Sequence, residues 1–104
     1  MKIIVLKFGG TSIGSIHRIK KVAKIVKSYT KKYKVIILSS AMSGTTNKLI
    51  DMSKKISDNF ADNEYDTLVS AGEQISCSLL AGQLIANGIQ ARSLMAWQLS
   101  LIHI

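Results

Sequence analysis

Two short segments combine glycine with residues that could bind an anion. The first, "KFGGTS" (residues 7–12), follows the apolar run "IIVL", and the second, "SSAMSGTTN" (residues 39–47), follows "KVIIL". Gly9 and Gly10 have no side chains, so backbone N–H groups there can approach an oxyanion, and Lys7 adds a mobile positive charge. The residue order fits neither a Walker A loop nor a G-x-G-x-x-G motif. Two interpretations stay open: a phosphate site, or a tight turn from strand to helix.

The second segment offers hydroxyl groups where a strand passes into a helix. A carboxylate or phosphate could bind there, because the N-terminus of a helix has positive potential. The alternative is ordinary turn and capping chemistry, with Thr45 or Thr46 as the N-cap. The hydroxyl-bearing candidates are Ser39, Ser40, Ser43, Thr45 and Thr46.

Glu73 is the only ionised residue between Asp66 and Arg92. It follows Gly72, and a glycine inside a helix costs about 1 kcal/mol relative to alanine. An isolated carboxylate could hold an ammonium group. The alternative is close packing at Gly72 with Glu73 on an exposed edge. Cys77 has no cysteine or histidine neighbour in sequence that would indicate a metal site or a nucleophile, so we expect a small core residue.

The elements that must position these residues alternate between strand and helix. Residues 2–8 and 34–40 form apolar runs typical of strands buried on both faces. Helical periodicity begins at about Ser15, and further helices are expected at residues 47–56 and 65–87, after a loop at 57–64. In the last helix one stripe comprises Leu68, Gly72, Ile75, Leu79 and Gln83, joined by Leu80 and Leu84. Gly88 ends this helix, and an extended segment follows at 89–99. The pattern predicts an α/β domain with a mainly parallel sheet.

Charge is distributed unevenly along the 104 residues. Residues 1–50 contain eleven Lys or Arg and no acidic residue, within a net charge of +8. A basic half could bind nucleic acid, but no aromatic residues interleave with the lysines, so a solvated helix face is favoured. Residues 74–91 are uncharged yet contain many polar side chains, which disfavours a membrane span. The single cysteine is typical of a reducing compartment, so we expect a cytoplasmic protein.

Three motifs in order resemble the N-terminal part of the aspartate kinase family, within the amino acid kinase superfamily. They are "KFGGTS", "SAMSGTTNKL" and "LVSAGEQISCSLLAGQLIANGIQA", closing with "WQ". The likeness runs from about Lys2 to Gln98, with Ala96 where the family usually has glycine. It implies a three-layer sandwich with a mainly parallel sheet. It also implies transfer of the ATP γ-phosphoryl group to the side-chain carboxylate of L-aspartate, a step toward lysine, threonine and methionine.

The resemblance also implies roles for individual residues. Lys7, Phe8, Gly9 and Gly10 match the motif that contacts the ATP phosphates, with Lys7 as the catalytic residue. Ser40 and Thr46 match residues that hold aspartate, and Glu73 matches the carboxylate that binds its ammonium group. A carboxylate acceptor is already ionised at pH 7, so no general base is required. Positioning and charge neutralisation are the main tasks.

Family members are much longer, which implies that residues 1–104 are the N-terminal part of a kinase domain. The implied second half would carry the adenine, ribose and Mg²⁺ contacts, so we expect the 104 residues alone not to phosphorylate aspartate. The implied ligands are ATP, Mg²⁺ and aspartate in a homo-oligomer, with no nucleic acid and no membrane. Two alternatives stay open: another amino acid or carbamate kinase of the superfamily, or a basic nucleic-acid-binding module.

Overall fold

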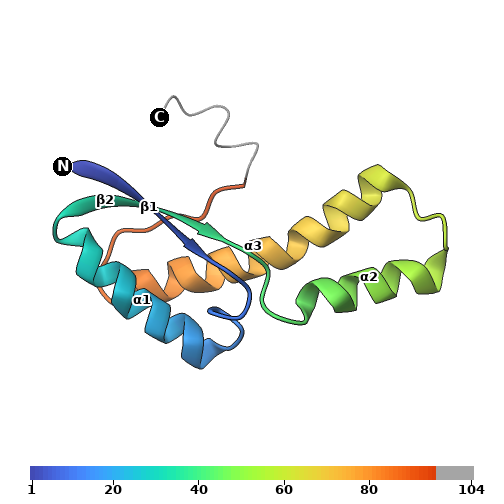
Figure 1. Ribbon diagram of the computed structural model, residues 1–104, viewed down its shortest axis with the longest axis horizontal. Helices are drawn as coiled ribbons and strands as arrows, with labels where there is room; N and C mark the ends of the chain where they lie inside the picture. Colours follow the sequence, from blue (N-terminus) through green and yellow to red (C-terminus); the bar gives the residue numbers. More distant parts are fainter. Residues whose placement is uncertain (96–104) are drawn as a thin grey trace.

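A computed structural model describes residues 1–95, which form two strands and three helices (Figure 1). Their order is β1 (Lys2–Phe8), α1 (Ile16–Thr30), β2 (Tyr33–Ser39), α2 (Thr45–Ile56) and α3 (Asp62–Ala86). The predicted alternation is therefore confirmed up to α3. The extended segment expected at 89–99 forms no strand over residues 89–95, where Ile89 and Ala91 pack against the core instead. Its remainder, with Ala96 and Gln98, lies outside the described residues.

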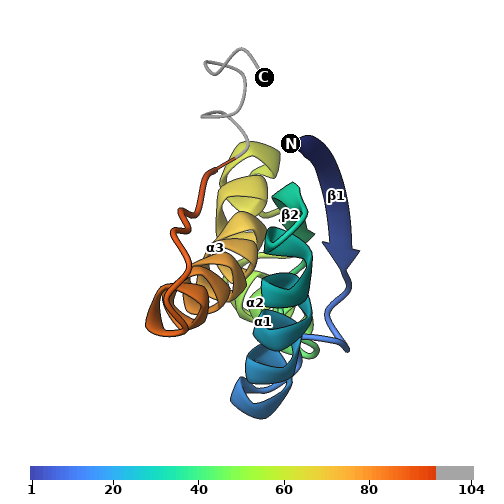
Figure 2. The same ribbon diagram turned by 90° about the vertical axis from the view of Figure 1, so that its left-hand side faces the viewer.

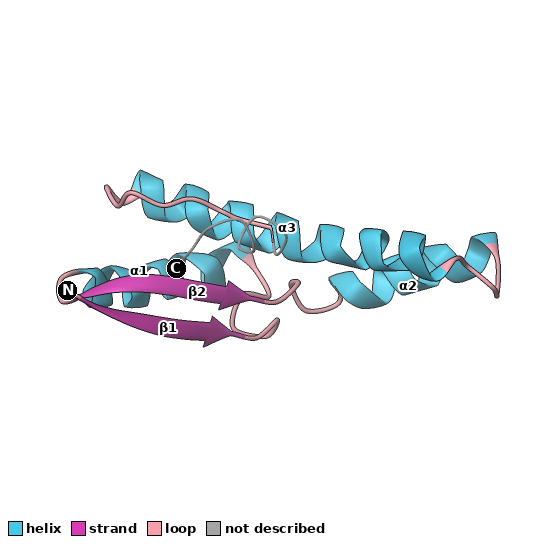
Figure 3. Ribbon diagram, turned by 90° about the horizontal axis from the view of Figure 1, so that it is seen from above, coloured by secondary structure: helices cyan, strands magenta, loops and turns pink. Residues whose placement is uncertain are grey.

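Strands β1 and β2 pair in parallel, from Lys2 opposite Tyr33 to Phe8 opposite Ser39. Figure 3 shows both strands ending at the same edge of the sheet, the edge toward α2. Helix α1 connects the two strands, as a parallel pair requires. The two loops that follow the strands therefore lie at one edge of the sheet, which is where α/β proteins bind ligands.

Helices cover one face of this sheet. Helices α1 and α3 lie on the same side of the strands (Figure 2). On the uncovered face, Ile3 and Val5 are each 56% exposed and Leu38 is 47% exposed. The prediction of strands buried on both faces is therefore wrong for residues 1–95, because both helices that pack on the sheet occupy its other face. The α/β class and the parallel sheet are confirmed.

The core lies between the covered sheet face, α1 and α3. Leu6, Phe8, Val35 and Ile37 of the strands pack against it. The helix predicted to begin at about Ser15 is confirmed, and its buried residues lie on the face toward the core. Such packing supplies most of the stability of a helix of this length. The buried hydrophobic cluster is Ile13, Ile19, Val22, Ala23, Val26, Leu80 and Leu84.

The helix ends show which local signals operate. Ser15 caps α1, and its Oγ accepts a hydrogen bond from the backbone N–H of Arg18 at 3.2 Å. Helix α2 begins instead after Gly44, whose φ of +85° suits glycine, and no side chain caps it. The expectation that Thr45 or Thr46 is the N-cap is therefore wrong. Helix α3 begins at Asp62, inside the predicted loop, because acidic residues in the first turn favour a helix N-terminus.

The buried side of α3 agrees with the predicted stripe only in part. Gly72, Leu80 and Leu84 are buried as predicted and Ser76 is buried as well, whereas Ile75 is 50% exposed. The two small residues allow a loop to approach the helix backbone, and this close contact outweighs the burial of larger neighbours. Within residues 1–95, no helix combines the length and the apolar character that crossing a membrane requires.

Two glycines inside α3 provide a matched test of this packing. A Cβ at Gly72 would lie 3.1 Å from both Ala41 Cβ and Thr45 Cγ2, whereas a Cβ at Gly82 would meet nothing within 4 Å. Both substitutions to alanine gain helix propensity, about 1 kcal/mol. We expect Gly82→Ala to raise the free energy of unfolding by roughly that amount and Gly72→Ala to lower it, since overpacking costs about 1–3 kcal/mol. Urea unfolding followed by circular dichroism measures both. An equal gain from the two variants would contradict the close contact.

Candidate functional site

The loops that follow β1 and β2 pack backbone against backbone. The Ser40 N–H donates to the Phe8 carbonyl at 3.2 Å, and the Ser43 N–H donates to the Gly10 carbonyl at 3.1 Å. A Cβ at Gly10 would lie only 2.6 Å from the Ala41 carbonyl oxygen. No other residue fits there without moving the neighbouring backbone. The glycine motif of the first loop is thus explained in part by its contact with the second.

Helix α3 packs against the second of these two loops. Gly72 faces Ala41 and Thr45 of the second loop, and the Ser76 hydroxyl donates to the Ser40 carbonyl at 2.6 Å. Glu73 lies between these two contact residues in the sequence. The three motifs noticed in the sequence therefore meet at the carboxyl ends of the two parallel strands.

The first loop has the features of an anion site. Two turn hydrogen bonds shape it, from the N–H groups of Ser12 and Gly14 to the carbonyls of Gly9 and Thr11. Space is open beside Gly9, where a Cβ would meet nothing within 4 Å. The loop leads into α1, which has no acidic residue in its first turn to compete with a bound anion.

Arg18 of α1 holds this loop from the helix side. Its Nη1 donates to the Thr11 carbonyl at 2.7 Å, while its own backbone N–H is bonded to Ser15. Sequence reasoning missed this residue. Arg18 lies one turn after the N-cap, so its side chain can reach back to the loop. In the sequence it looks like one more basic residue before the lysines that follow it.

Lys7 and Phe8 point to opposite faces of the sheet. Lys7 pairs in register with Leu38 and is exposed, whereas Phe8 packs against the core. Any contact of Phe8 with a ligand would therefore involve its backbone. The Lys7 ammonium group is free to move around the strand end, since Lys7 belongs to no ion pair within residues 1–95.

Ser40, Thr46 and Glu73 surround the second loop. Ser40 and Thr46 are half-buried, and Thr46 lies in the first turn of α2, where no acidic residue occurs. Glu73 is exposed and, within the described part of the chain, forms no ion pair. The site thus offers the N-terminus of α2, which has positive potential, and the separate carboxylate of Glu73. This combination suits a ligand that carries both a negative and a positive group.

Ser39, Ser76 and Cys77 form a polar cluster where β2 meets α3. The hydroxyls of Ser39 and Ser76 are 3.3 Å apart. Burial raises the pKa of the Cys77 thiol above its ordinary value; a hydrogen bond with Ser39 lowers it, and the negative charge of Glu73 raises it further. Cys77 is therefore a largely protonated thiol at neutral pH, half-buried as a small packing residue.

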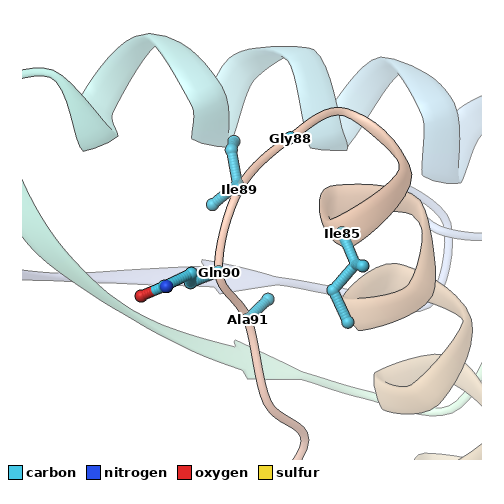
Figure 4. A pocket seen from close by; sticks show the side chains of 5 residues that line it. All are labelled: Ile85, Gly88, Ile89, Gln90 and Ala91. Atoms are coloured by element: carbon cyan, nitrogen blue, oxygen red, sulfur yellow. The ribbon is translucent and has the colours of Figure 1, made fainter.

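The described residues offer no metal centre at this site. Within residues 1–95 no three His, Cys, Asp or Glu residues lie close enough together to hold a metal ion. A basic hollow lies between α1 and α3, with Lys20, Lys24 and Gln83 among its lining residues. A shallower hollow lies at the end of α3 (Figure 4), lined by Ile85, Gly88, Ile89, Gln90 and Ala91. Neither hollow contains a candidate site residue.

The chain is similar in sequence to known proteins. Residues 2–101 match the model of the amino acid kinase family. The chain is similar to an aspartokinase of Geobacillus stearothermophilus, 46% identical over 99 residues, which are 94% of this chain and 24% of that protein. It is also similar to an aspartate kinase of Pseudomonas putida, 48% identical over 94 residues, which are 89% of this chain and 23% of that protein.

A solved structure gives a similar result. The crystal structure of aspartate kinase from Synechocystis superposes with a TM-score of 0.78 at 40% identity, over 82% of this chain and 15% of that one. In length, the chain spans about a quarter of the relatives from Geobacillus stearothermophilus and Pseudomonas putida. The similarity in sequence and the similarity in fold point to the same group of proteins.

The thiol of Cys77 provides a probe for the position of Glu73. The negative charge of Glu73 raises the Cys77 pKa, so Glu73→Gln should lower that pKa and increase the thiolate fraction at pH 8. We expect faster alkylation by iodoacetamide and a pH–rate profile shifted to lower pH. Glu64→Gln is the matched control, because Glu64 lies 13 residues before Cys77 in α3 and thus about 20 Å from it. An unchanged profile in Glu73→Gln would place its carboxylate away from Cys77.

Proposed function

The chain belongs to the amino acid kinase family, and from that premise we propose that it is the N-terminal part of an aspartate kinase. The complete protein would transfer the γ-phosphoryl group of ATP to the side-chain carboxylate of L-aspartate. The named relatives are aspartokinases at 46% and 48% identity, which supports aspartate over other acceptors. Residues 1–104 would belong to the kinase domain of a cytoplasmic protein.

One observation carries the proposal. The phosphate-type loop, the hydroxyl-rich loop and the helix with Glu73 meet through direct contacts at one edge of a parallel sheet. Each motif alone has an ordinary structural explanation. A shared location supports one composite site, because phosphoryl transfer requires donor and acceptor to be held together.

The proposed roles follow from charge. Lys7, with the loop at Gly9 and Gly10, would hold the ATP phosphates and offset the charge that develops on the transferred group. Phe8 would contribute through its backbone, since its side chain packs against the core. The reaction brings two anions together, so the main tasks are to neutralise their charge and to hold both reactants in a fixed orientation.

The acceptor would be held at both ends. Ser40 and Thr46 would donate hydrogen bonds to a carboxylate of aspartate near the N-terminus of α2, and Glu73 would bind the ammonium group. The acceptor carboxylate is ionised at neutral pH, so no side chain needs to remove a proton. This fits a set of residues that contains no catalytic histidine or cysteine.

The described residues fit ATP phosphates but not a metal. The open side of Gly9 and the exposed Lys7 leave room for an anion. Aspartate kinases are expected to use Mg²⁺ with ATP, but residues 1–95 hold no suitable cluster of ligands. We therefore assign no metal contact and no step through a metal to these residues.

The experiment that tests the proposal is a coupled ADP-release assay on the complete gene product. ATP, Mg²⁺ and L-aspartate should together give turnover. Parallel reactions with L-glutamate and with carbamate address the alternative of another kinase in the family. Turnover with one of these acceptors and none with aspartate would refute the proposed substrate.

Glu73→Gln in the complete gene product should chiefly raise the KM for aspartate. The substitution removes the charge proposed to hold the substrate ammonium group, while the phosphate loop stays intact. We expect at least about a 10-fold rise, which corresponds to about 1.4 kcal/mol, and a KM for ATP within 2-fold of the wild type. Glu64→Gln on the same helix is the control. A wild-type KM for aspartate would remove Glu73 from the site.

Lys7→Ala should chiefly lower kcat, because the transferring phosphoryl group loses a neutralising charge. We expect a loss of more than about 10-fold, or about 1.4 kcal/mol in the barrier. Lys34→Ala is a suitable control, since Lys34 is an exposed lysine of β2 at the other end of the sheet. A folded Lys7→Ala enzyme with more than a tenth of wild-type kcat would contradict the catalytic role.

A further inference from the structure

One serine links two of the motifs directly. Ser76 is fully buried, with 0% exposure. Its hydroxyl lies 2.6 Å from the Ser40 carbonyl oxygen, 3.0 Å from the Glu73 carbonyl oxygen and 3.3 Å from the Ser39 hydroxyl. A hydroxyl has a single proton to donate, and the shortest contact, to Ser40, is the natural acceptor. Ser39 can then donate to the Ser76 oxygen, which completes the cluster.

The link to Ser40 distinguishes Ser76 from other helical serines of the described chain. Ser53 and Ser78 bond only to carbonyls of their own helix, at 2.7 Å for Ser53 and 2.8 Å or 3.0 Å for Ser78. Such bonds are common in helices and connect nothing else. The Ser76 bond instead crosses from α3 to the loop after β2, between segments 36 positions apart in the sequence.

We propose that Ser76 is a positioning residue, which fixes the Ser40 loop relative to the helix that carries Glu73. This inference rests on the proposed function, in which Ser40 and Glu73 bind opposite ends of aspartate. Glu73 lies three residues before Ser76, on the adjacent turn, so the bond ties the two ends of the proposed acceptor site. Gly72, in contact with Ala41, makes the same junction by packing.

A loss of this hydroxyl has a specific expected effect. In Ser76→Ala the Ser40 carbonyl loses its short hydrogen bond of 2.6 Å to α3 and keeps only the long one of 3.4 Å from the adjacent Ser39 hydroxyl. The loop can then shift relative to α3 while the remaining fold stays packed. The acceptor would then be held less well, and its carboxylate would be misplaced relative to ATP. The ATP phosphates should be affected less, since the first loop is held by backbone hydrogen bonds that do not involve Ser76, from Ser40 N–H to the Phe8 carbonyl and from Ser43 N–H to the Gly10 carbonyl.

The test compares four variants in the complete gene product. Ser76→Ala should raise the KM for aspartate about 5- to 50-fold and lower kcat, with the KM for ATP within 2-fold of the wild type. Ser76→Cys keeps a weak donor of similar size and should fall between Ser76→Ala and the wild type. Two matched controls should keep wild-type constants: Ser53→Ala, a buried serine of α2 at 2% exposure, and Ser78→Ala, an exposed serine of α3.

Hydrogen exchange provides a readout that does not depend on activity. Peptides covering residues 39–46 should exchange faster in Ser76→Ala, but not in Ser53→Ala or Ser78→Ala. If the wild type does not phosphorylate aspartate, the proposed function fails while exchange still reports on the link. The positioning role is overturned if Ser76→Ala and Ser53→Ala show the same KM for aspartate and the same exchange in this loop. Should Ser76→Ala fail to fold, Ser76→Cys decides by the same two measurements.

Discussion

The close contact between α3 and the loop after β2 is the constraint on which the arrangement depends. Gly72 and Ser76 are small enough for the loop backbone to reach the helix, and the Ser76 hydroxyl satisfies the Ser40 carbonyl there. The same loop is bonded on its other side to Gly10. One segment of backbone thus determines where the first loop, the start of α2 and Glu73 lie relative to each other.

This constraint is consistent with the proposed reaction, which would need few specialised side chains. A nucleophile that is already ionised requires placement and a neutralised approach to a second anion. In the proposal, backbone groups, hydroxyls and a lysine at strand and helix ends would supply both. Burial raises the pKa of the Cys77 thiol and thereby makes it less reactive. It belongs to the packing of the junction and takes no proposed part in the reaction.

Much of this could be predicted from local sequence signals. Ser15 begins a helix because its hydroxyl accepts a backbone N–H, and the apolar face of α1 follows directly from spacing. The buried side of α3 could be predicted in part, since Gly72, Leu80 and Leu84 belong to the predicted stripe. Ser76 could not, because its burial depends on a loop that approaches from another part of the chain. Gly44 as the N-cap was missed for a different reason: two threonines are adequate caps until the Met42–Thr45 turn, with its hydrogen bond of 3.0 Å, requires a positive φ before them. The first miss results from a tertiary contact and the second from turn geometry.

The constant register of the strands also has a consequence for how this chain folds. Each pair of the β1–β2 ladder joins residues 31 positions apart, as Lys2 does with Tyr33 and Phe8 with Ser39. The first pair to form pays the entropy of closing that whole loop, and each later pair adds almost nothing to the cost. Formation of α1 shortens the loop that must close, so helix and strand pairing should support each other. The two loops of the candidate site, which follow the strand ends, take their positions only when this pairing is complete.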